Sequence, residues 1–242
     1  MLKNVQKMSI NYSPNFDSRK RSVSKVKYLI FHYTGMKSEK GAIRRLTSLN
    51  SKVSCHYFIK NDGEIIQIVP DLYIAWHAGI SYWKKDKLLN SNSIGIEISN
   101  PGHKNGYKKF NIKQIKSIIK LSRSLKKKYK IKKENILGHS DISPLRKIDP
   151  GEKFPWQLLA KKNISLWHNI NKKKCKKLRN LKFKDKVSFY KLLFKFGYKS
   201  ANNSSEKIKI YKNFQRRFRP QLINSIIDHE CYAILKSLIY KN

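Results

Sequence analysis

Acidic residues are scarce in this 242-residue sequence, and cysteine is scarcer still. Asp and Glu together number 15 against 54 Lys and Arg, which gives a formal net charge of +39. An even set of regularly spaced cysteines would indicate a disulfide framework or a paired metal motif. The cysteines here are odd in number and far apart, which argues against both and predicts reduced thiols: Cys55, Cys175 and Cys231.

Long apolar runs are also missing. No stretch approaches the roughly 20 apolar residues that a membrane-spanning helix needs. The start of the chain contains Asn, Ser, Asp and Lys throughout and lacks the apolar core of a secretory signal. We therefore expect a cytoplasmic protein without a transmembrane segment, with periplasmic placement or export by an unconventional route as the alternative.

Glycine and proline are few, at 10 and 7 residues, while hydrophobic residues make up 40% of the chain. This composition is typical of a globular protein, and the length suits one sizeable domain plus a small one. The positive charge points to a polyanionic partner, such as nucleic acid, an anionic membrane surface or a cell-wall polymer. The alternative is a compositional bias that spreads charge everywhere, because the excess is mainly Lys and accompanies many Ile and Asn residues.

Short apolar runs rich in β-forming residues predict strands that end near polar side chains. The first such run ends at His32. Another run alternates cleanly, with isoleucines on one face and Glu97 on the other face beside Gly95 and Ser99. An Asp-Gly turn between two further runs predicts a hairpin. The predicted strand segments are residues 27–33, 55–60, 64–69, 93–99 and 131–137.

Amphipathic helices are predicted between these strands, over residues 39–49 and 111–129. Strands and helices that interleave along a chain indicate an α/β domain, here a mixed β-sheet flanked by helices over residues 26–170. Residues 1–25 precede this domain as a polar lead-in.

The character of the chain changes near its C-terminal third. Residues 171–183 are rich in Lys and predict a solvated basic linker. The segments that follow predict a small three-helix domain over residues 184–242, an appended binding module too short to bury much core of its own. Its predicted helices cover residues 185–196, 206–218 and 222–239.

The loop at residues 138–151 concentrates groups that carry chemistry, because it contains His139, Lys147 and Asp149. His139 and Asp149 are too far apart to share a helical face, so they meet only if the loop folds back. Catalytic zinc usually takes three protein ligands and keeps one position for water. His32, at another strand end, is the candidate third ligand, and the set then offers two nitrogens and one oxygen.

Zinc in such a site can bring the pKa of water from 15.7 to about 7 and polarise a carbonyl. Glu97 is the candidate base for the attacking water, a contribution typically worth roughly 10²–10⁴ in rate. Lys147 is placed to stabilise the developing oxyanion. Taken singly, each residue has a plainer interpretation, since a strand-end histidine is more often a hydrogen-bonded core residue and a mid-strand glutamate is usually solvated.

Five motifs follow one another along the chain: Phe31-His32-Tyr33-Thr34, Ser54-Cys55-His56-Tyr57-Phe58-Ile59, Ala75-Trp76-His77-Ala78-Gly79, Ser93-Ile94-Gly95-Ile96-Glu97 and the loop at 138–151. In this order they resemble the zinc-dependent N-acetylmuramoyl-L-alanine amidases of type 2, a superfamily shared with peptidoglycan-recognition proteins and phage amidase lysozymes. The resemblance implies that His32, His139 and Asp149 hold one zinc ion. It also implies that Glu97 and Lys147 serve catalysis.

The implied reaction is hydrolysis of the amide between N-acetylmuramic acid, or its anhydro form, and L-Ala of peptidoglycan stem peptides, in cell-wall turnover or remodelling. The implied partners are peptidoglycan or muropeptides, with no specific nucleic acid. Asp149 stands where some relatives have Cys, which is similar to the AmiD-like bacterial subgroup and the cytoplasmic recycling amidases. Cys55 stands where some relatives have a catalytic Tyr. His56, Trp76 and His77 lie in family motifs and are expected to shape the cleft and hold substrate.

The C-terminal segments resemble a peptidoglycan-binding domain of the three-helix type, although the Gly usual before its last segment is missing. Two rival functions stay open. A non-catalytic peptidoglycan receptor would lack a zinc ligand, whereas all three positions are filled here. A nucleic-acid-binding protein is suggested by the charge alone, since no nucleic-acid motif is recognisable. Three histidines have no supporting neighbours in the sequence and are interpreted as incidental: His103, His168 and His229.

Overall fold

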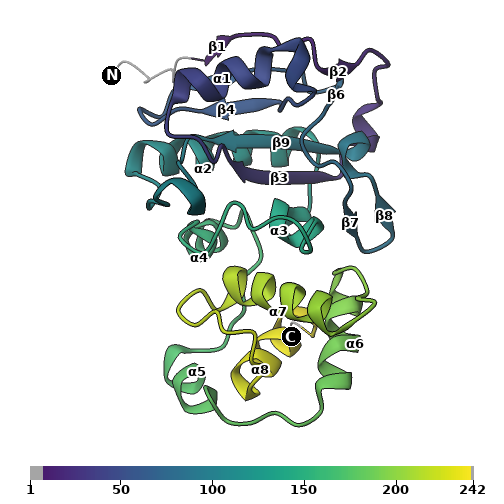
Figure 1. Ribbon diagram of the computed structural model, residues 1–242, viewed down its shortest axis with the longest axis vertical. Helices are drawn as coiled ribbons and strands as arrows, with labels where there is room; N and C mark the ends of the chain where they lie inside the picture. Colours follow the sequence, from purple (N-terminus) through teal and green to yellow (C-terminus); the bar gives the residue numbers. More distant parts are fainter. Residues whose placement is uncertain (1–7, 241–242) are drawn as a thin grey trace.

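The computed structural model describes residues 8–240, which form an α/β fold around a mixed sheet (Figure 1). Within these residues the sheet has six strands in the order β1-β5-β4-β9-β3-β10. β5 runs antiparallel to β4, and the other neighbouring pairs are parallel. The strands are β1 Met8–Ile10, β3 Tyr28–Tyr33, β4 Tyr57–Ile59, β5 Ile65–Gln67, β9 Ser93–Ile98 and β10 Ile136–Gly138.

Short antiparallel pairs lie beside this sheet: β2 (Phe16–Asp17) with β6 (Ile74–Ala75), and β7 (Tyr82–Trp83) with β8 (Asp86–Lys87). None of the helices within residues 8–240 is long and apolar enough to cross a membrane. The α-helices of this part of the chain are α1 Glu39–Thr47, α2 Ile112–Lys128, α3 His139–Ile142, α4 Trp156–Lys161, α5 Lys172–Leu178, α6 Lys186–Phe196, α7 Ser204–Phe218 and α8 His229–Ile239.

The register of β3 and β9 places His32 directly opposite Glu97. Because side chains alternate along a strand, these two point to the same face of the sheet. The other face is apolar and is covered by α2 and α4. Its buried side chains from the two strands are Leu29, Phe31, Ile94, Ile96 and Ile98.

The face that carries His32 has two separate covers. On one side α1 packs its Ala42 and Leu46 against Phe58 of β4. On the other side the face around Ile30 packs into a cluster that includes side chains of α6, α7 and α8. The carboxyl ends of β3 and β9 lie between the two covers, which is where open parallel sheets place their ligand sites.

Capping side chains explain two of the helix starts. Ser38 accepts a hydrogen bond from the backbone N–H of Gly41 at the start of α1. Asn111 and Gln114 form a capping box at the start of α2. These helices are therefore confirmed close to their predicted boundaries, as are the strands β3 and β9 and the hairpin of β4 and β5.

The N-terminal boundary differs from the prediction of a polar lead-in at 1–25. From Met8 onward this segment belongs to the fold, because β1 adds to the sheet beside β5 and β2 pairs with β6. Residues 1–7 of the predicted lead-in lie outside the described residues.

The strand that precedes the 138–151 loop, predicted at residues 131–137, is also shorter than predicted. Only Ile136–Gly138 (β10) pairs with β3 in this segment, because Lys133–Asn135 form a 3₁₀ turn ahead of it. The loop then opens with the helical turn α3, in which Asp141 Oδ2 accepts a hydrogen bond of 2.7 Å from the N–H of Gly138.

The helices α5 to α8 are called here the C-terminal helices, and α6, α7 and α8 share one hydrophobic cluster with the sheet. Ile30 and Leu137 of the sheet belong to the same cluster as Phe189 and Phe214. Trp83 of the β7–β8 hairpin packs edge-on against two aromatic rings of this region, those of Phe196 and Tyr198. Figure 1 shows α7 as the C-terminal helix nearest to α3 and α4. These helices therefore complete their core on the α/β part of the molecule.

Two expectations for this region are corrected. The predicted solvated linker at 171–183 contains α5, which is capped by the Asn171 side chain and buries Cys175. Arg179, just after α5, pairs with the buried Glu230 of α8 at 2.7 Å. The composition predicted a linker because most side chains of α5 are exposed lysines, and the one buried residue, Cys175, leaves no compositional signal.

The last predicted helix, at 222–239, begins only at His229, after its cap Asp228. The residues before it wrap around the buried amide of Gln215 instead of coiling. Gln215 Oε1 accepts hydrogen bonds from the backbone N–H groups of Asn224 and Ser225.

Candidate active site and metal centre

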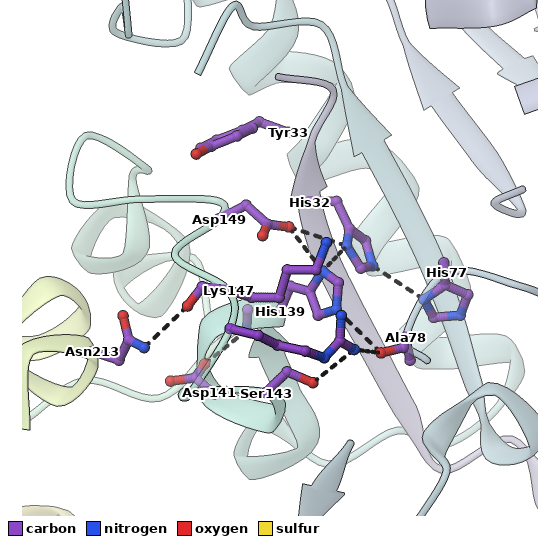
Figure 2. Close-up of polar contacts among 12 residues, drawn as sticks. His32, Tyr33, His77, Ala78, His139, Asp141, Ser143, Lys147, Asp149 and Asn213 are labelled. Carbon is purple, nitrogen blue, oxygen red and sulfur yellow. Dashed lines mark hydrogen bonds and ion pairs between the residues drawn. The ribbon is translucent and has the colours of Figure 1, made fainter. Parts of the chain in front are cut away.

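His32, His139 and Asp149 converge on one point at the carboxyl ends of β3 and β10 (Figure 2). His32 Nδ1 lies 2.9 Å from His139 Nδ1 and 3.2 Å from Asp149 Oδ2. His139 Nδ1 lies 3.1 Å from the same carboxylate oxygen. All three side chains are buried. The loop folds back as the sequence required, and Ser140 N donates to Asp149 O at 2.8 Å to hold its two ends together.

The hydrogen bonds around His32 decide which of its nitrogens carries the proton. Ser93 Oγ donates its single hydrogen to Leu89 O at 2.5 Å, so toward His77 it acts as acceptor. His77 Nε2 then donates to Ser93 at 3.2 Å, which leaves Nδ1 of His77 as an acceptor. His32 Nε2 donates to that atom at 3.1 Å. The lone pair of His32 is therefore on Nδ1, facing the other two residues.

His139 is oriented in the same sense. Its Nε2 donates to the carbonyl oxygen of Ala78 at 3.2 Å, because a carbonyl can only accept. Arg146 donates to the same carbonyl at 2.6 Å and so fixes its position. Nδ1 of His139 is left with its lone pair toward Asp149.

Three acceptor atoms thus face one another without a hydrogen to share, an arrangement that needs a cation between them. Zinc bonds of about 2.0–2.2 Å at tetrahedral angles place neighbouring ligand atoms roughly 3.3 Å apart. The separations of 2.9, 3.1 and 3.2 Å are close to that value. The donor set of two imidazoles and one carboxylate, with each imidazole held by a further hydrogen bond, is also what zinc prefers. The residues present fit a zinc ion.

Burial and charge keep these side chains in the forms that bind a metal. Burial lowers the pKa of His32 to about 4, and the neighbouring His139 acts in the same direction. Burial alone would raise the pKa of Asp149, but the neighbouring imidazoles of His139 and His32 hold it below its usual range. At neutral pH His32 is neutral and Asp149 is ionised.

Glu97 lines the cleft beside these residues. Burial raises the pKa of its carboxyl to about 8, and the charge of Asp149 adds to the rise. Its Oε2 atom is buried and has no hydrogen-bond partner among residues 8–240. A carboxyl group with a raised pKa and a free oxygen is suited to accept and return a proton.

Lys147 projects into the same cleft from the 138–151 loop. Figure 2 shows its side chain reaching toward the cluster of His32, His139 and Asp149. Its backbone is held at both ends, because its N–H donates to Ser143 O at 3.0 Å and its carbonyl accepts from Asn213 Nδ2 at 3.0 Å. The structure therefore brings together all five residues that the sequence proposed for metal binding and catalysis.

The cleft has a volume of about 520 Å³ and is open to solvent along its rim. Trp76 and His77 line it, and their predicted contact with substrate stays a prediction. His56 does not, which corrects the expectation that it holds substrate. Its side chain is fully buried, and its Nδ1 accepts the backbone N–H of Gly95 at 3.0 Å.

Several residues with a place at the site were not predicted. His103, interpreted as incidental, lines the cleft and hydrogen-bonds Glu152 at 3.0 Å and Tyr33 at 3.0 Å. The role of Ser93 was missed although it lies in a quoted motif, because its partner His77 is distant in sequence. Cys55 is fully buried, and burial raises the pKa of its thiol well above the usual value.

Known proteins resemble this chain in sequence and in structure. The family model described as N-acetylmuramoyl-L-alanine amidase matches residues 22–152. The N-acetylmuramoyl-L-alanine amidase AmiD of Escherichia coli (strain K12) is 35% identical over 234 residues, which are 90% of this chain and 83% of AmiD. The 1,6-anhydro-N-acetylmuramyl-L-alanine amidase AmpD of Haemophilus influenzae is 40% identical over 107 residues, 44% of this chain and 56% of AmpD.

Solved structures extend the likeness to the C-terminal helices. E. coli AmiD, in complex with the substrate anhydro-N-acetylmuramic acid-L-Ala-D-γ-Glu-L-Lys, superposes with a TM-score of 0.80 at 33% identity. That match covers 92% of this chain and 93% of AmiD. AmpDh3 of Pseudomonas aeruginosa gives a TM-score of 0.80 at 26% identity over 91% of this chain and 92% of its own. By its family model, its relatives and its fold, the chain belongs to the N-acetylmuramoyl-L-alanine amidase family.

Proposed function

We propose that this amidase works with one zinc ion held by His32, His139 and Asp149, and that it cleaves the amide between N-acetylmuramic acid and L-Ala in muropeptides. The observation that carries the proposal is the convergence of three acceptor atoms within 4.8 Å of one another, beside a cleft lined by two of these residues and by Glu97 and Lys147. When bound there, zinc would supply a Lewis acid and lower the pKa of water from 15.7 to about 7.

Glu97 is the proposed general base and then general acid. It takes the proton of the attacking water and returns it to the amide nitrogen that leaves as the amine of L-Ala. Its raised pKa, about 8, makes the carboxyl hold that proton between the two steps. Its unpartnered Oε2 leaves one oxygen available for the transfer.

Lys147 is the proposed stabiliser of the oxyanion that forms when the amide carbonyl is attacked. Donors fixed in advance at such a position are commonly worth 10²–10³ in kcat. Its place in the cleft wall, on a loop tied at both ends, supports this role.

The walls of the cleft support a muropeptide as substrate. Arg45 and Lys104 bring positive charge to the lining, and Trp76 offers a half-buried ring for a sugar or peptide face. A γ-linked glutamate, as in the substrate of the AmiD complex, leaves an α-carboxylate that such charges would attract.

Exchange of Glu97 for Gln tests the assignment. Mass spectrometry of the products from anhydro-muropeptide and from polymeric peptidoglycan should show free stem peptide with the wild type. We expect Glu97→Gln to lower kcat by about 10²–10⁴ while zinc stays bound. Glu134→Gln, outside the cleft, is the matched control and should be fully active. Normal turnover by the Glu97 variant would refute the role.

A further inference from the structure

Helix α7 makes direct contact with the 138–151 loop through a buried amide. Asn213 Nδ2 donates to Pro144 O at 2.8 Å and to Lys147 O at 3.0 Å (Figure 2). The Asn213 side chain is buried, and the two carbonyls it binds flank the turn from which the Lys147 side chain departs. One side chain of a C-terminal helix thus holds the backbone of the proposed oxyanion stabiliser.

The orientation of this amide is set by the next turn of α7. Arg216 donates to Asn213 Oδ1, so that Nδ2 is the atom left to face the two carbonyls. Arg216 Nε also lies 3.3 Å from Glu152 Oε2, just after the loop. Residues i and i+3 lie on the same side of a helix, so one face of α7 reaches both the middle and the end of the loop.

The start of the loop is held by the same helix. Asp141, which is fully buried, accepts the N–H of Gly138 at the beginning of α3, the turn that carries His139. Arg217 of α7 pairs with Asp141 and donates to Ile136 O at 2.9 Å. Tyr198 OH donates to the second oxygen of Asp141 at 2.8 Å. The carboxylate of Asp141, two residues after His139, is therefore neutralised by Arg217 of α7 and hydrogen-bonded by Tyr198, which follows α6.

We propose that α7 is a positioning element for the catalytic loop, and that Asn213 is a positioning residue that acts through Lys147. The inference rests on the proposed function, in which the Lys147 ammonium stabilises the oxyanion of the reacting carbonyl. Asn213 would help to hold that ammonium in place. It gives the C-terminal helices a part in turnover that is separate from any affinity for the cell wall.

The physical reason is that Ser143 and Arg146 tie this turn to Ile80 and Ala78 through their side chains, whereas two of its carbonyls accept, within residues 8–240, from Asn213 alone. Lys147 is tied at its N–H to Ser143, but its carbonyl and that of Pro144 both rely on Asn213. Without the amide, both carbonyls lose their partner and the turn can tilt. A displacement of about 1 Å in a catalytic group can cost roughly 10²-fold in rate.

The test uses the full chain with zinc and a soluble anhydro-muropeptide, so that wall affinity has no influence. We expect Asn213→Ala to lower kcat by roughly 10–100-fold with KM nearly unchanged, as for an interaction that matters in the transition state. Zinc content should equal that of the wild type. Asn213→Ser is made alongside, because it removes the amide with a smaller change in polarity.

The matched control is Gln215→Ala. Gln215 is a buried amide on the same helix, but its side-chain hydrogen bonds go to residues 224–226, between α7 and α8, and to Cys231 of α8. The Gln215→Ala substitution should lower thermal stability without lowering kcat of the folded enzyme. A loss of kcat equal to that of Asn213→Ala would mean that any damage to α7 has this effect, and would overturn the inference.

A double-mutant cycle with Lys147→Ala tests whether Asn213 acts through Lys147. We expect Asn213→Ala to add no further loss of kcat once the Lys147 ammonium is gone. Additive losses, or a folded Asn213 variant with wild-type kcat, would overturn the inference while leaving the amidase activity intact. A wild-type chain that releases no stem peptide would overturn the proposed function itself, and this inference with it.

Discussion

His32 donates from Nε2 to Nδ1 of His77 at 3.1 Å, and this contact turns the lone pair of His32 toward His139 and Asp149. His77 can accept because its own Nε2 proton is committed to Ser93. A chain of hydrogen bonds that ends at Leu89 O thus selects the nitrogen that faces the proposed metal. His77 lies in the cleft wall, yet its ring contacts His32, one of the proposed metal ligands.

Replacing His77 should therefore weaken zinc binding more than it changes substrate binding. We expect His77→Leu to lower zinc affinity by about 10–100-fold, because the orientation and tautomer of His32 are no longer fixed. Competition with a chromogenic chelator measures this directly. His103→Leu, also in the cleft wall, should bind zinc as the wild type does. Equal zinc affinity in the His77 variant and the wild type would show that the contact is incidental.

Gly95 provides the space that His77 occupies. A Cβ atom at this position would lie 2.4 Å from Cγ and 2.5 Å from Nδ1 of the His77 ring. Because the ring is buried, it cannot move aside cheaply, and we expect Gly95→Ala to cost about 1–3 kcal/mol of stability and to reduce zinc affinity as well. Chemical denaturation and chelator competition measure the two effects.

Gly41→Ala is the matched control, since a Cβ atom in helix α1 would meet its neighbours at 3.4 Å. It should leave zinc affinity unchanged and can raise stability slightly. A Gly95→Ala protein as stable as the wild type, with normal zinc affinity, would contradict the placement of His77.

The ion pair of Arg217 and Asp141 lies almost entirely out of solvent, with side-chain exposures of 2% and 0%. Removing one partner leaves a buried charge without compensation. We expect Arg217→Met to destabilise the chain by about 3–5 kcal/mol in urea denaturation. Adding Asp141→Asn should recover part of that loss, because the uncompensated charge is then gone. If the double variant is less stable than Arg217→Met by the full cost of Asp141→Asn alone, the two residues are not coupled.

The proposed metal ligands could be predicted from the sequence because two of them, His32 and His139, lie at the ends of short segments with a clear local strand pattern. His32 ends a strand of β-forming residues, and His139 follows β10, which pairs with the same strand. Two neighbouring parallel strands bring their carboxyl ends together, so the convergence follows once both strands are recognised. The return of Asp149 to the same edge was a condition of the predicted site, because His139 and Asp149 meet only if the loop folds back.

Other features depend on contacts between distant segments and have no local signal. Asn213 meets Lys147 across 66 residues of chain. The helix α5 is concealed by its lysines, since only Cys175 among residues 172–178 is buried. His56 and His77 both lie in motifs, but only the folded sheet decides that one is enclosed behind Gly95 and the other reaches His32.

Titration of the metal-free chain with zinc tests the central claim most directly. Mass spectrometry follows the release of stem peptide from anhydro-muropeptide as zinc is added to protein stripped by a chelator. We predict no release without zinc, a rise with each addition, and saturation at one zinc per chain, with His32→Ala, His139→Ala and Asp149→Ala inactive at that level. Undiminished release by the stripped protein, or full activity in any of the three variants at one zinc per chain, would contradict the account.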